Sequence, residues 1–287
     1  MPRYAYVDGR YLPHGQAAVH IEDRGYQFAD GVYEVIPVVA GRPVDEGPHL
    51  DRLERSLAEL RIAMPVPRRA LGLICREMLR RNGLRDGLVY LQVTRGVAPR
   101  NHSFPAQAQP TLVITTKRMN FAADRKFESG VSVITVPDRR WARRDIKTTN
   151  LLPNCLAKQQ AAEAGAYEAL QVDEKGCVTE GTSSNAWIVT ADGKLVTRQL
   201  SNDILHGVTR RTILAIAMEE NVTFEERPFT VAEALNASEA FVTSATSFVT
   251  PVVRIDGNPV GDGKPGPLTR HLLAWYRDYI AGTRGAA

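Results

Sequence analysis

Arg100 and His102 stand two positions apart in a short polar loop, residues 99–105, which follows the strand-like run LVYLQVT at 88–94. In an extended backbone, side chains two positions apart point to the same side. A guanidinium and an imidazole placed together suit an anion, because the guanidinium can donate two parallel hydrogen bonds to a carboxylate or phosphate. The pair predicts an anion-binding loop, and the alternative is an arginine that bonds only to the backbone.

Lys147 and Glu180 are candidates for covalent and acid–base chemistry. Lys147 lies in RRDIKTTNLLPN (143–154), between a strand-like run and a helix start near Pro153. Most lysines in such a connection are surface residues, but a buried amine with a lowered pKa can form a Schiff base with a carbonyl compound. Glu180 ends a strand-like run in VTEGTSSNAW (178–187), where a polar loop leading into a hairpin is the simpler interpretation.

Two further segments could bind an anion such as a phosphate. Val208 and Thr209 stand at the start of a predicted helix, where backbone N–H groups and the helix dipole favour negative charge. Capping of that helix by Thr209 is an equally simple explanation. FVTSATS (241–247) is a strand-like run that leads into hydroxyl residues, suited to an anion or to a plain loop. These segments place a lysine, a carboxylate and two anion sites in order along one chain.

Hydrophobic periodicity indicates the elements that must position these residues. Apolar residues recur with helical spacing in several segments, and Gly165 and Asn221 stand where two of these helices would end. Asp-Gly pairs between strand-like runs indicate hairpins. The helical segments are 50–63, 68–82, 154–165, 209–221 and 267–280, and the hairpin turns are at 8–9, 192–193 and 256–257.

The order of these elements predicts an α+β fold with two domains and prominent antiparallel pairing. Hairpins, two helices and further strands precede a polar stretch at 117–129, which is the expected linker. We therefore expect an N-terminal domain over residues 1–120 and a C-terminal domain over 121–287 that carries Lys147. Ligands often lie between two such domains, so we expect residues of both halves to share one site.

Composition and charge argue against several classes of protein. Hydrophobic residues make up 44% and charged residues 24% of the 287 residues, so a substantial core is expected and disorder is not. The net charge is +4 and the basic residues are scattered, which favours a solvated surface over nucleic-acid binding. The six His show no zinc-type spacing, so no metal site is predicted. With no signal-peptide or membrane-spanning pattern and three Cys without a C-x-x-C pair, a cytoplasmic protein without a membrane partner is expected.

Seven segments, in one order, resemble those of the fold type IV pyridoxal-phosphate enzymes, the family of D-amino acid and branched-chain aminotransferases and aminodeoxychorismate lyase. The resemblance implies a two-domain α+β fold with pyridoxal 5′-phosphate at the domain interface. It also implies a homodimer in which a neighbour's loop completes the site. The segments are YVDGRYLP, RGYQFADGVYEV, HLDRL, DIKTTNLLPN, EAL with VTEGTSSNAW, LHGVTRRTI and FVTSATS, and they cover nearly the whole chain.

The resemblance implies cofactor-binding roles for the matching residues. Lys147 matches the lysine that holds the cofactor as a Schiff base, and Glu180 the carboxylate that keeps the pyridine nitrogen protonated. Arg52 in HLDRL resembles the arginine that binds the phosphate. Relatives carry a hydroxyl residue at the position of Ala245, so Ala245 can offer only its backbone N–H and Thr246 is expected to supply the hydroxyl. The other expected contacts are Leu205 against the ring face, with Val208 and Thr209 at the phosphate.

The resemblance also implies a role for the loop that contains Arg100 and His102. Together with Tyr33 in GVYEV, these residues resemble the carboxylate trap of D-amino acid aminotransferases. We therefore expect transamination of D-amino acids, such as D-alanine and D-glutamate, with a 2-oxo acid such as 2-oxoglutarate or pyruvate. A branched-chain L-aminotransferase, an (R)-amine transaminase, an aminodeoxychorismate lyase and a cofactor-binding protein without turnover are the alternatives. The Arg100–His102 pair argues against the first, and the presence of both Lys147 and Glu180 against the last.

Overall fold

The computed structural model describes residues 3–121 and 125–283, which form two compact units. The first unit comprises residues 3–121 together with Ile146–Asn150, and the second comprises the other described residues. Residues 122–124 of the predicted linker, and residues 1–2 and 284–287 of the predicted domains, lie outside the described residues. Each unit has its own sheet, and the predicted α+β class is confirmed.

The first unit, as far as the structure describes it, is built on a six-stranded antiparallel sheet in the order β2-β1-β6-β5-β3-β4. The β1–β2 turn is formed by Asp8 and Gly9, both with positive φ, as the Asp-Gly pair predicts. The three central strands pair along nearly their full length. The strands are β1 (Tyr4–Val7), β2 (Arg10–Pro13), β3 (Gly31–Val39), β4 (Arg42–Pro43), β5 (Gly87–Thr94) and β6 (Thr111–Arg118).

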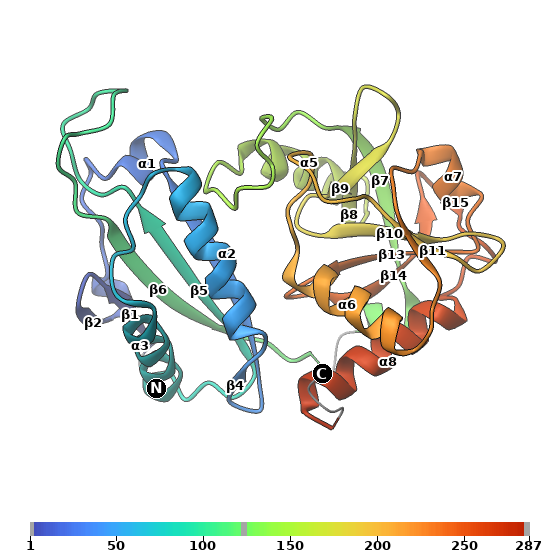
Figure 1. Cartoon of the computed structure of the whole chain (residues 1–287), viewed down its shortest axis with the longest axis horizontal. Coiled ribbons are helices and arrows are strands. Elements are labelled where there is room, and N and C mark those ends of the chain that lie inside the picture. The colour runs from blue at the N-terminus through green and yellow to red at the C-terminus, as the bar shows by residue number, and fades with distance from the viewer. Residues whose placement is uncertain (1–2, 122–124, 284–287) are drawn as a thin grey trace. The chain divides into compact units, whose positions relative to one another are not determined.

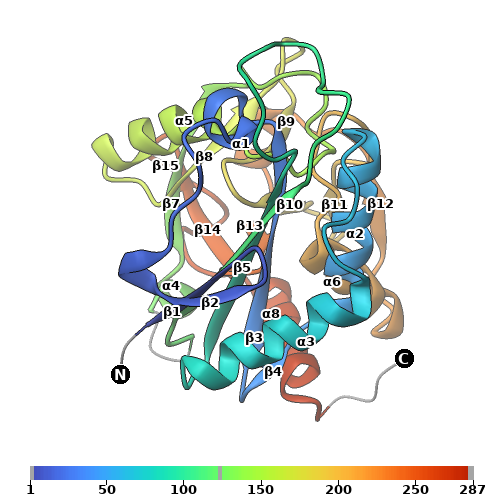
Figure 2. The same ribbon diagram turned by 90° about the vertical axis from the view of Figure 1, so that its left-hand side faces the viewer.

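Two amphipathic helices, α2 (Glu46–Glu59) and α3 (Arg68–Arg81), cover one face of this sheet (Figures 1 and 2). Leu50, Leu53 and Leu57 recur at helical spacing on α2, and all three are buried in the core of the unit. A 3₁₀ turn, η1 (His14–Gln16), and a short helix, α1 (Arg24–Phe28), precede β3. The core thus fixes α2 and β3 against each other, and both elements carry predicted site residues.

The segment Ile146–Asn150 adds to the edge of β3 in the manner of a short antiparallel strand. The Tyr33 N–H donates a hydrogen bond to the Lys147 carbonyl at 3.0 Å, and the Thr149 N–H donates to the Gly31 carbonyl at 3.0 Å. The sequence predicts Lys147 in the C-terminal domain. Here these backbone hydrogen bonds place it in the first unit, and no local sequence signal specifies such long-range pairing.

The second unit has a mixed sheet, described with the order β12-β11-β10-β13-β14-β7-β8-β9, and β15 pairs with β14. Most pairs are antiparallel, but β7 runs parallel to both β8 and β14, and β11 runs parallel to β12. The strands are β7 (Val131–Pro137), β8 (Glu168–Val172), β9 (Val178–Gly181), β10 (Asn185–Val189), β11 (Leu195–Thr197), β12 (Phe224–Glu226), β13 (Glu239–Ser244), β14 (Phe248–Ile255) and β15 (Asn258–Pro259).

The helices of the second unit pack on different strands of its sheet. α5 (Leu152–Glu163) packs against β7 and β8, whereas α6 (Val208–Glu219) and α8 (Pro267–Ala281) pack against β13 (Figure 1). Gly165 (φ 68°) and Asn221 (φ 57°) adopt the left-handed conformation just after α5 and α6, as predicted for helix ends. Two short helices, α4 (Lys126–Ser129) and α7 (Val231–Leu235), complete the unit.

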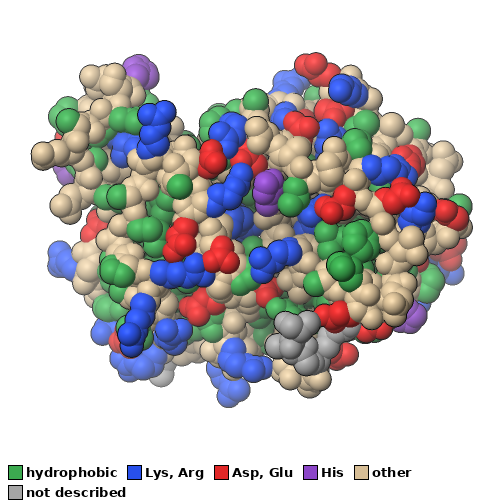
Figure 3. Space-filling model, in the orientation of Figure 1, with side chains coloured by type: hydrophobic (Ala, Val, Ile, Leu, Met, Phe, Trp, Pro, Cys, Tyr) green, Lys and Arg blue, Asp and Glu red, His purple; other side chains and the backbone are tan. Residues whose placement is uncertain are grey.

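Two features of the structure concern nucleic acid and the membrane, neither of which the sequence predicts as a partner. On the face drawn in Figure 3, Lys and Arg side chains are interspersed with Asp and Glu side chains. Among the described residues, no helix combines the length and the apolar character that crossing a membrane requires.

Candidate active site

Lys147 and Tyr33, two of the predicted site residues, are in contact. The Lys147 Nζ atom lies 4.2 Å from the centre of the Tyr33 ring, and that ring stacks on Tyr90 at 5.6 Å between centroids. The backbone of Lys147 is held from a second side, because its N–H donates to the Oγ of the buried Ser56 on α2 at 3.3 Å. Burial raises the pKa of Tyr90 to about 12, so the stacked partner stays a neutral phenol. Strand β3 and helix α2 therefore hold the backbone of Lys147, and its amine lies over the Tyr33 ring, which stacks on Tyr90 of β5.

Arg52, which also lies on helix α2, forms a buried ion pair with Glu34 of strand β3. Its Nε and Nη2 atoms donate to the two carboxylate oxygens of Glu34 at 2.7 and 2.8 Å, and His49 Nδ1 lies 2.8 Å from Glu34 Oε2. Burial alone would raise the pKa of Glu34, but Arg52 and His49 lower it to about 2. Glu34 is therefore ionised and fixes the orientation of the Arg52 guanidinium. Contact of Arg52 with a phosphate stays a prediction.

The loop that carries Arg100 and His102 is held by Arg24, a buried residue of α1. The Arg24 Nη atoms donate to the backbone carbonyls of residues 101–103, and its Nε donates to Asp30 Oδ2 at 2.8 Å. Asp30 also accepts two hydrogen bonds from Arg95, at 2.7 and 3.0 Å. Arg24 thus holds the backbone of this loop, and the anion-binding role of Arg100 stays a prediction.

Arg100 and His102 meet at the ring of Phe28. The Arg100 guanidinium carbon lies 4.6 Å from the Phe28 centroid, and the His102 ring lies at 5.4 Å. Tyr33, the third residue of the predicted trap, has its described ring contacts with Lys147 and Tyr90. The structure therefore brings Arg100 and His102 together on one ring, and the trap formed by all three residues stays a prediction.

Glu180 is buried in β9, and its carboxylate is held on several sides. It accepts hydrogen bonds from the Leu205 N–H at 3.1 and 3.2 Å, from Asn185 Nδ2 at 3.0 Å, and from Arg140. Burial raises the pKa of Glu180, and Arg140 together with the Leu205 N–H opposes that shift. The structure therefore brings the Leu205 backbone N–H to Glu180 and fixes the direction of the carboxylate, and the contact predicted between Leu205 and the ring face stays a prediction.

The N-terminus of α6 begins at Gly207, which is the N-cap residue, and Val208 and Thr209 follow as buried residues. Thr209 is therefore not the cap that the alternative interpretation proposed. A Cβ atom at Gly207 would lie 2.0 Å from Asn185 Oδ1. Glycine at this position lets Asn185 reach both the Leu205 carbonyl, at 3.0 Å, and Glu180. The start of the helix and the carboxylate are thus parts of one local arrangement.

The turn between β13 and β14 gathers hydroxyl groups. The Ser244 Oγ accepts hydrogen bonds from the N–H groups of Thr246 and Ser247 at 3.3 and 3.1 Å. The same atom lies 2.6 Å from Ser247 Oγ and 3.3 Å from Thr246 Oγ1. Such a cluster of hydroxyl and N–H donors is suited to an anion. The phosphate contacts predicted for Ala245 and Thr246 stay predictions.

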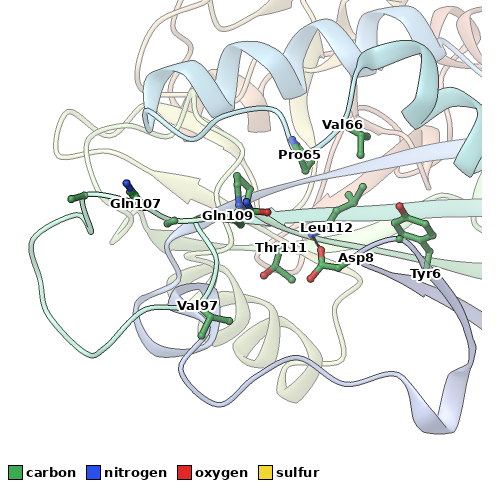
Figure 4. A pocket seen from close by; sticks show the side chains of 13 residues that line it. Tyr6, Asp8, Pro65, Val66, Val97, Gln107, Gln109, Thr111 and Leu112 are labelled. Atoms are coloured by element: carbon green, nitrogen blue, oxygen red, sulfur yellow. Dashed lines mark hydrogen bonds between the residues drawn. The ribbon is translucent and has the colours of Figure 1, made fainter.

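A surface pocket of about 1000 Å³ lies elsewhere in the first unit (Figure 4). Its lining includes Asp8, Pro65, Val97 and Gln109, and Asp8 accepts a hydrogen bond from the Leu112 N–H at 2.7 Å. The predicted site residues, all of which lie in the described part of the chain, are not among its lining residues. The pocket is therefore not the candidate active site.

Sequence reasoning missed four residues that organise the site: Arg24, Ser56, Arg140 and Asn185. Asn185 lies within the quoted stretch VTEGTSSNAW, so its amide side chain was a visible signal. Arg140 is one of four arginines in DRRWARRD (138–145), and nothing in the sequence separates it from the others. Arg24 and Ser56 form hydrogen bonds with segments that are far away in the sequence, and no local sequence pattern indicates such contacts.

Comparison with known proteins identifies the family. The model of the family "Amino-transferase class IV" matches residues 31–255. The chain belongs to this family. It is 42% identical over 277 residues to the D-alanine aminotransferase of Staphylococcus haemolyticus, covering 96% of this chain and 97% of the relative. It is 43% identical over 265 residues to that of Bacillus licheniformis, covering 92% and 93%.

This class IV aminotransferase has the same fold as a solved branched-chain amino acid aminotransferase. It superposes on the branched-chain amino acid aminotransferase of Thermobaculum terrenum, solved in its PLP-bound holo form, with a TM-score of 0.84 and 27% identity over 99% of this chain and 95% of that chain. The fold type IV resemblance is thus confirmed, and so is the prediction that the chain is an aminotransferase.

Proposed function

We propose that this class IV aminotransferase moves the amino group of D-amino acids, of the D-alanine and D-glutamate type, to a 2-oxo acid such as 2-oxoglutarate or pyruvate. The observation that carries the proposal is the meeting of Arg100 and His102 on Phe28, in a loop that Arg24 holds. The relatives that match at 42% and 43% identity over nearly the whole chain are named D-alanine aminotransferases. The solved branched-chain enzyme matches at 27% identity, which favours the D-amino acid reaction over that alternative.

Several features support pyridoxal 5′-phosphate as the cofactor. A pyridinium N–H needs an ionised acceptor, and Glu180 is a buried carboxylate held in one direction by Leu205 and Asn185. A phosphate needs several donors, and the start of α6 at Gly207 and the hydroxyl cluster at Ser244 are of that kind. The residues present therefore fit the group.

The residues of this chain divide the work of the reaction. When bound, pyridoxal 5′-phosphate supplies an aldehyde and a ring that withdraws electrons from the substrate's Cα. Lys147 Nζ would hold the cofactor covalently, and its free amine would take the proton from the substrate's Cα as a general base. Glu180 would keep the ring nitrogen protonated. Lys147 would reach the bound substrate from one face. The position at which Arg100 and His102 hold the substrate's carboxylate would therefore decide which enantiomer presents its Cα–H to Lys147.

A panel of substrates tests the proposed function. D- and L-amino acids and (R)-amines would each be incubated with 2-oxoglutarate or pyruvate, and the amino acid product measured. D-alanine and D-glutamate are expected to react fastest. Faster reaction of branched-chain L-amino acids or of (R)-amines would overturn the D-amino acid assignment and leave the family assignment intact.

We propose further that the enzyme is a homodimer. Large apolar side chains are exposed beside the loop of Arg100, among them Ile21 (76% exposed) and Tyr26 (77% exposed). A β-bridge between Asp23 and Val97 holds the segment that contains Ile21 and Tyr26 next to the start of the loop that carries Arg100. Exposed apolar surface of this kind is typical of an interface between proteins, and the family resemblance implies that a second copy of the chain covers it. We also propose the cytoplasm as its compartment, because the three cysteines are free thiols.

Arg100→Ala is expected to lower kcat/KM for D-alanine and D-glutamate by about 2–4 kcal/mol, or about thirtyfold to a thousandfold, because it leaves a desolvated carboxylate without its partner. An (R)-amine has no carboxylate, so activity on (R)-1-phenylethylamine should change little. The measurement is kcat/KM for both substrates, with Arg69→Ala, an exposed arginine of α3, as the control. Equal losses on both substrates, or none on D-alanine, would place the carboxylate trap elsewhere.

Mixing two variants tests whether the neighbour's loop completes the site. If Arg100 serves the partner's Lys147, dimers that combine a Lys147→Ala subunit with an Arg100→Ala subunit contain one intact site. Dissociating and reassembling an equal mixture should then restore about a quarter of the wild-type activity, since half of the dimers are mixed. No recovery, with mixed dimers demonstrated, would mean that Arg100 serves its own subunit.

A further inference from the structure

We infer that Arg140 is a positioning residue that keeps Glu180 ionised, by standing between Glu180 and a second buried carboxylate, Asp138. The inference rests on the proposed function, in which Glu180 holds the ring nitrogen of pyridoxal 5′-phosphate. It extends that function to a residue that does not need to touch the cofactor itself.

The contacts of Arg140 use the whole guanidinium. Its Nε and Nη2 donate to the two carboxylate oxygens of Asp138 at 2.9 and 2.7 Å, and its Nη1 donates to Glu180 Oε1. The exposed fraction of the side chain is 7% for Arg140, 0% for Asp138 and 4% for Glu180. Thr179 supports the arrangement, because its hydroxyl donates to Asp138 Oδ2 at 2.7 Å. One buried cation therefore separates two buried anions.

The pair belongs to a longer row of alternating charges. From Asp138 Oδ2 the row continues through Arg144 Nε at 3.2 Å, and then from Arg144 Nη1 to Asp203 Oδ1 at 3.2 Å. Asp203 Oδ2 pairs with Arg198 Nη2 at 3.1 Å, and Arg198 Nη1 with Asp173 Oδ2 at 2.8 Å. Asp203 is 45% exposed, so the row leads from the buried Glu180 to solvent. Within this row, Arg140 is the member that contacts Glu180.

Removing Arg140 would leave the carboxylates of Asp138 and Glu180 as buried neighbours. Two like charges in a buried site cannot both stay ionised at little cost, so one of the two takes up a proton. Without Arg140, Asp138 still has the Arg144 cation at 3.2 Å and the Thr179 hydroxyl at 2.7 Å, whereas the remaining contacts described for Glu180, with the Leu205 N–H and the Asn185 amide, are with neutral groups. Glu180 is therefore the carboxylate that becomes protonated, and a protonated Glu180 no longer favours a pyridinium.

A thermodynamic cycle separates this role from a merely structural one. Arg140→Gln removes the cation and leaves both carboxylates. The double variant Asp138→Asn/Arg140→Gln removes the cation and the competing anion together, so Glu180 can ionise again opposite the pyridinium. If Arg140 acted only through packing, the double variant would be at least as impaired as the single one.

The readout is the affinity of the apo-protein for pyridoxal 5′-phosphate relative to its 1-deaza analogue, in which C–H replaces the ring nitrogen. Wild type is expected to prefer the natural cofactor, and Arg140→Gln to lose about ten- to a hundredfold of that preference. The double variant should recover at least half of the loss on a logarithmic scale. Arg139→Gln, at an exposed neighbouring arginine, is the matched control and should behave as wild type.

The outcomes distinguish the inference from the function on which it rests. Wild type that does not bind pyridoxal 5′-phosphate, or does not prefer it to the analogue, overturns the role of Glu180 and the inference with it. An Arg140→Gln variant with wild-type preference overturns the inference alone, as does a double variant that recovers nothing. If Arg140→Gln does not fold, the double variant decides by itself: a preference within about tenfold of wild type supports the inference, and a larger loss refutes it.

Discussion

Purified Lys147→Ala enzyme is expected to be colourless and to lose nearly all turnover. In the proposed function the Lys147 amine both attaches the cofactor, which makes the wild-type protein yellow, and moves the proton at Cα. Loss of the general base alone costs about a hundredfold to ten-thousandfold, and loss of the attachment adds to that. The measurements are the visible absorbance after incubation with pyridoxal 5′-phosphate and product formation from D-alanine.

The melting temperature of Lys147→Ala should change little. The segment that carries Lys147 is held by backbone hydrogen bonds to Tyr33 and Ser56, and alanine preserves both. Lys117→Ala, at an exposed lysine of β6, is the matched control and should keep colour and turnover. A Lys147→Ala variant with normal turnover would remove the lysine from its proposed role.

Glu180→Gln is expected to keep the cofactor bound and to slow the half-reaction with D-alanine by several orders of magnitude. A neutral amide supports a pyridinium poorly, so the ring withdraws electrons less well. Loss of one charge-assisted hydrogen bond is worth about 1.5–3 kcal/mol, or about ten- to a hundredfold, before any electronic effect on the ring. Single-turnover absorbance changes of the bound cofactor measure the rate directly.

Glu239→Gln is a suitable control for Glu180→Gln, because Glu239 is also a buried carboxylate of the second unit. It accepts hydrogen bonds from the N–H groups of Leu268 and Thr269 at 3.0 and 2.8 Å, at the start of α8. Its replacement should lower the melting temperature and leave the half-reaction rate unchanged. Near wild-type single-turnover rates in Glu180→Gln would rule out its assignment.

The sequence predicted the helices well because apolar spacing is a local signal. It did not predict all of their ends. α2 was expected at 50–63, yet it begins at Glu46 and ends at Glu59. Its first turn is polar and includes Pro48, which is tolerated there because the first N–H groups of a helix have no partner within it. At the other end Arg61, with φ at 54°, terminates the helix although the apolar pattern continues.

The identity of the candidate site residues could be predicted, but their partners could not. Seven ordered segments were the basis for predicting the roles of Lys147 and Glu180, and these roles stay predictions. Which arginine lies against Glu180 depends on how the chain turns after β7, and Arg140 and Arg139 differ there only in the direction of their side chains. Arg24 likewise contacts carbonyls about eighty positions away in the sequence, and a local pattern contains no trace of such a contact.

The addition of Ile146–Asn150 to the edge of β3 has a consequence for biosynthesis. When a ribosome has made the last strand of the first unit, β6, that unit still lacks a piece of its sheet. The N-terminal half of the chain must keep part of the edge of β3 unpaired until later residues emerge, and unpaired strand edges are sites of association between chains. Slow translation just after β6 would prolong this state, so aggregation during expression should depend on codon choice between residues 119 and 150.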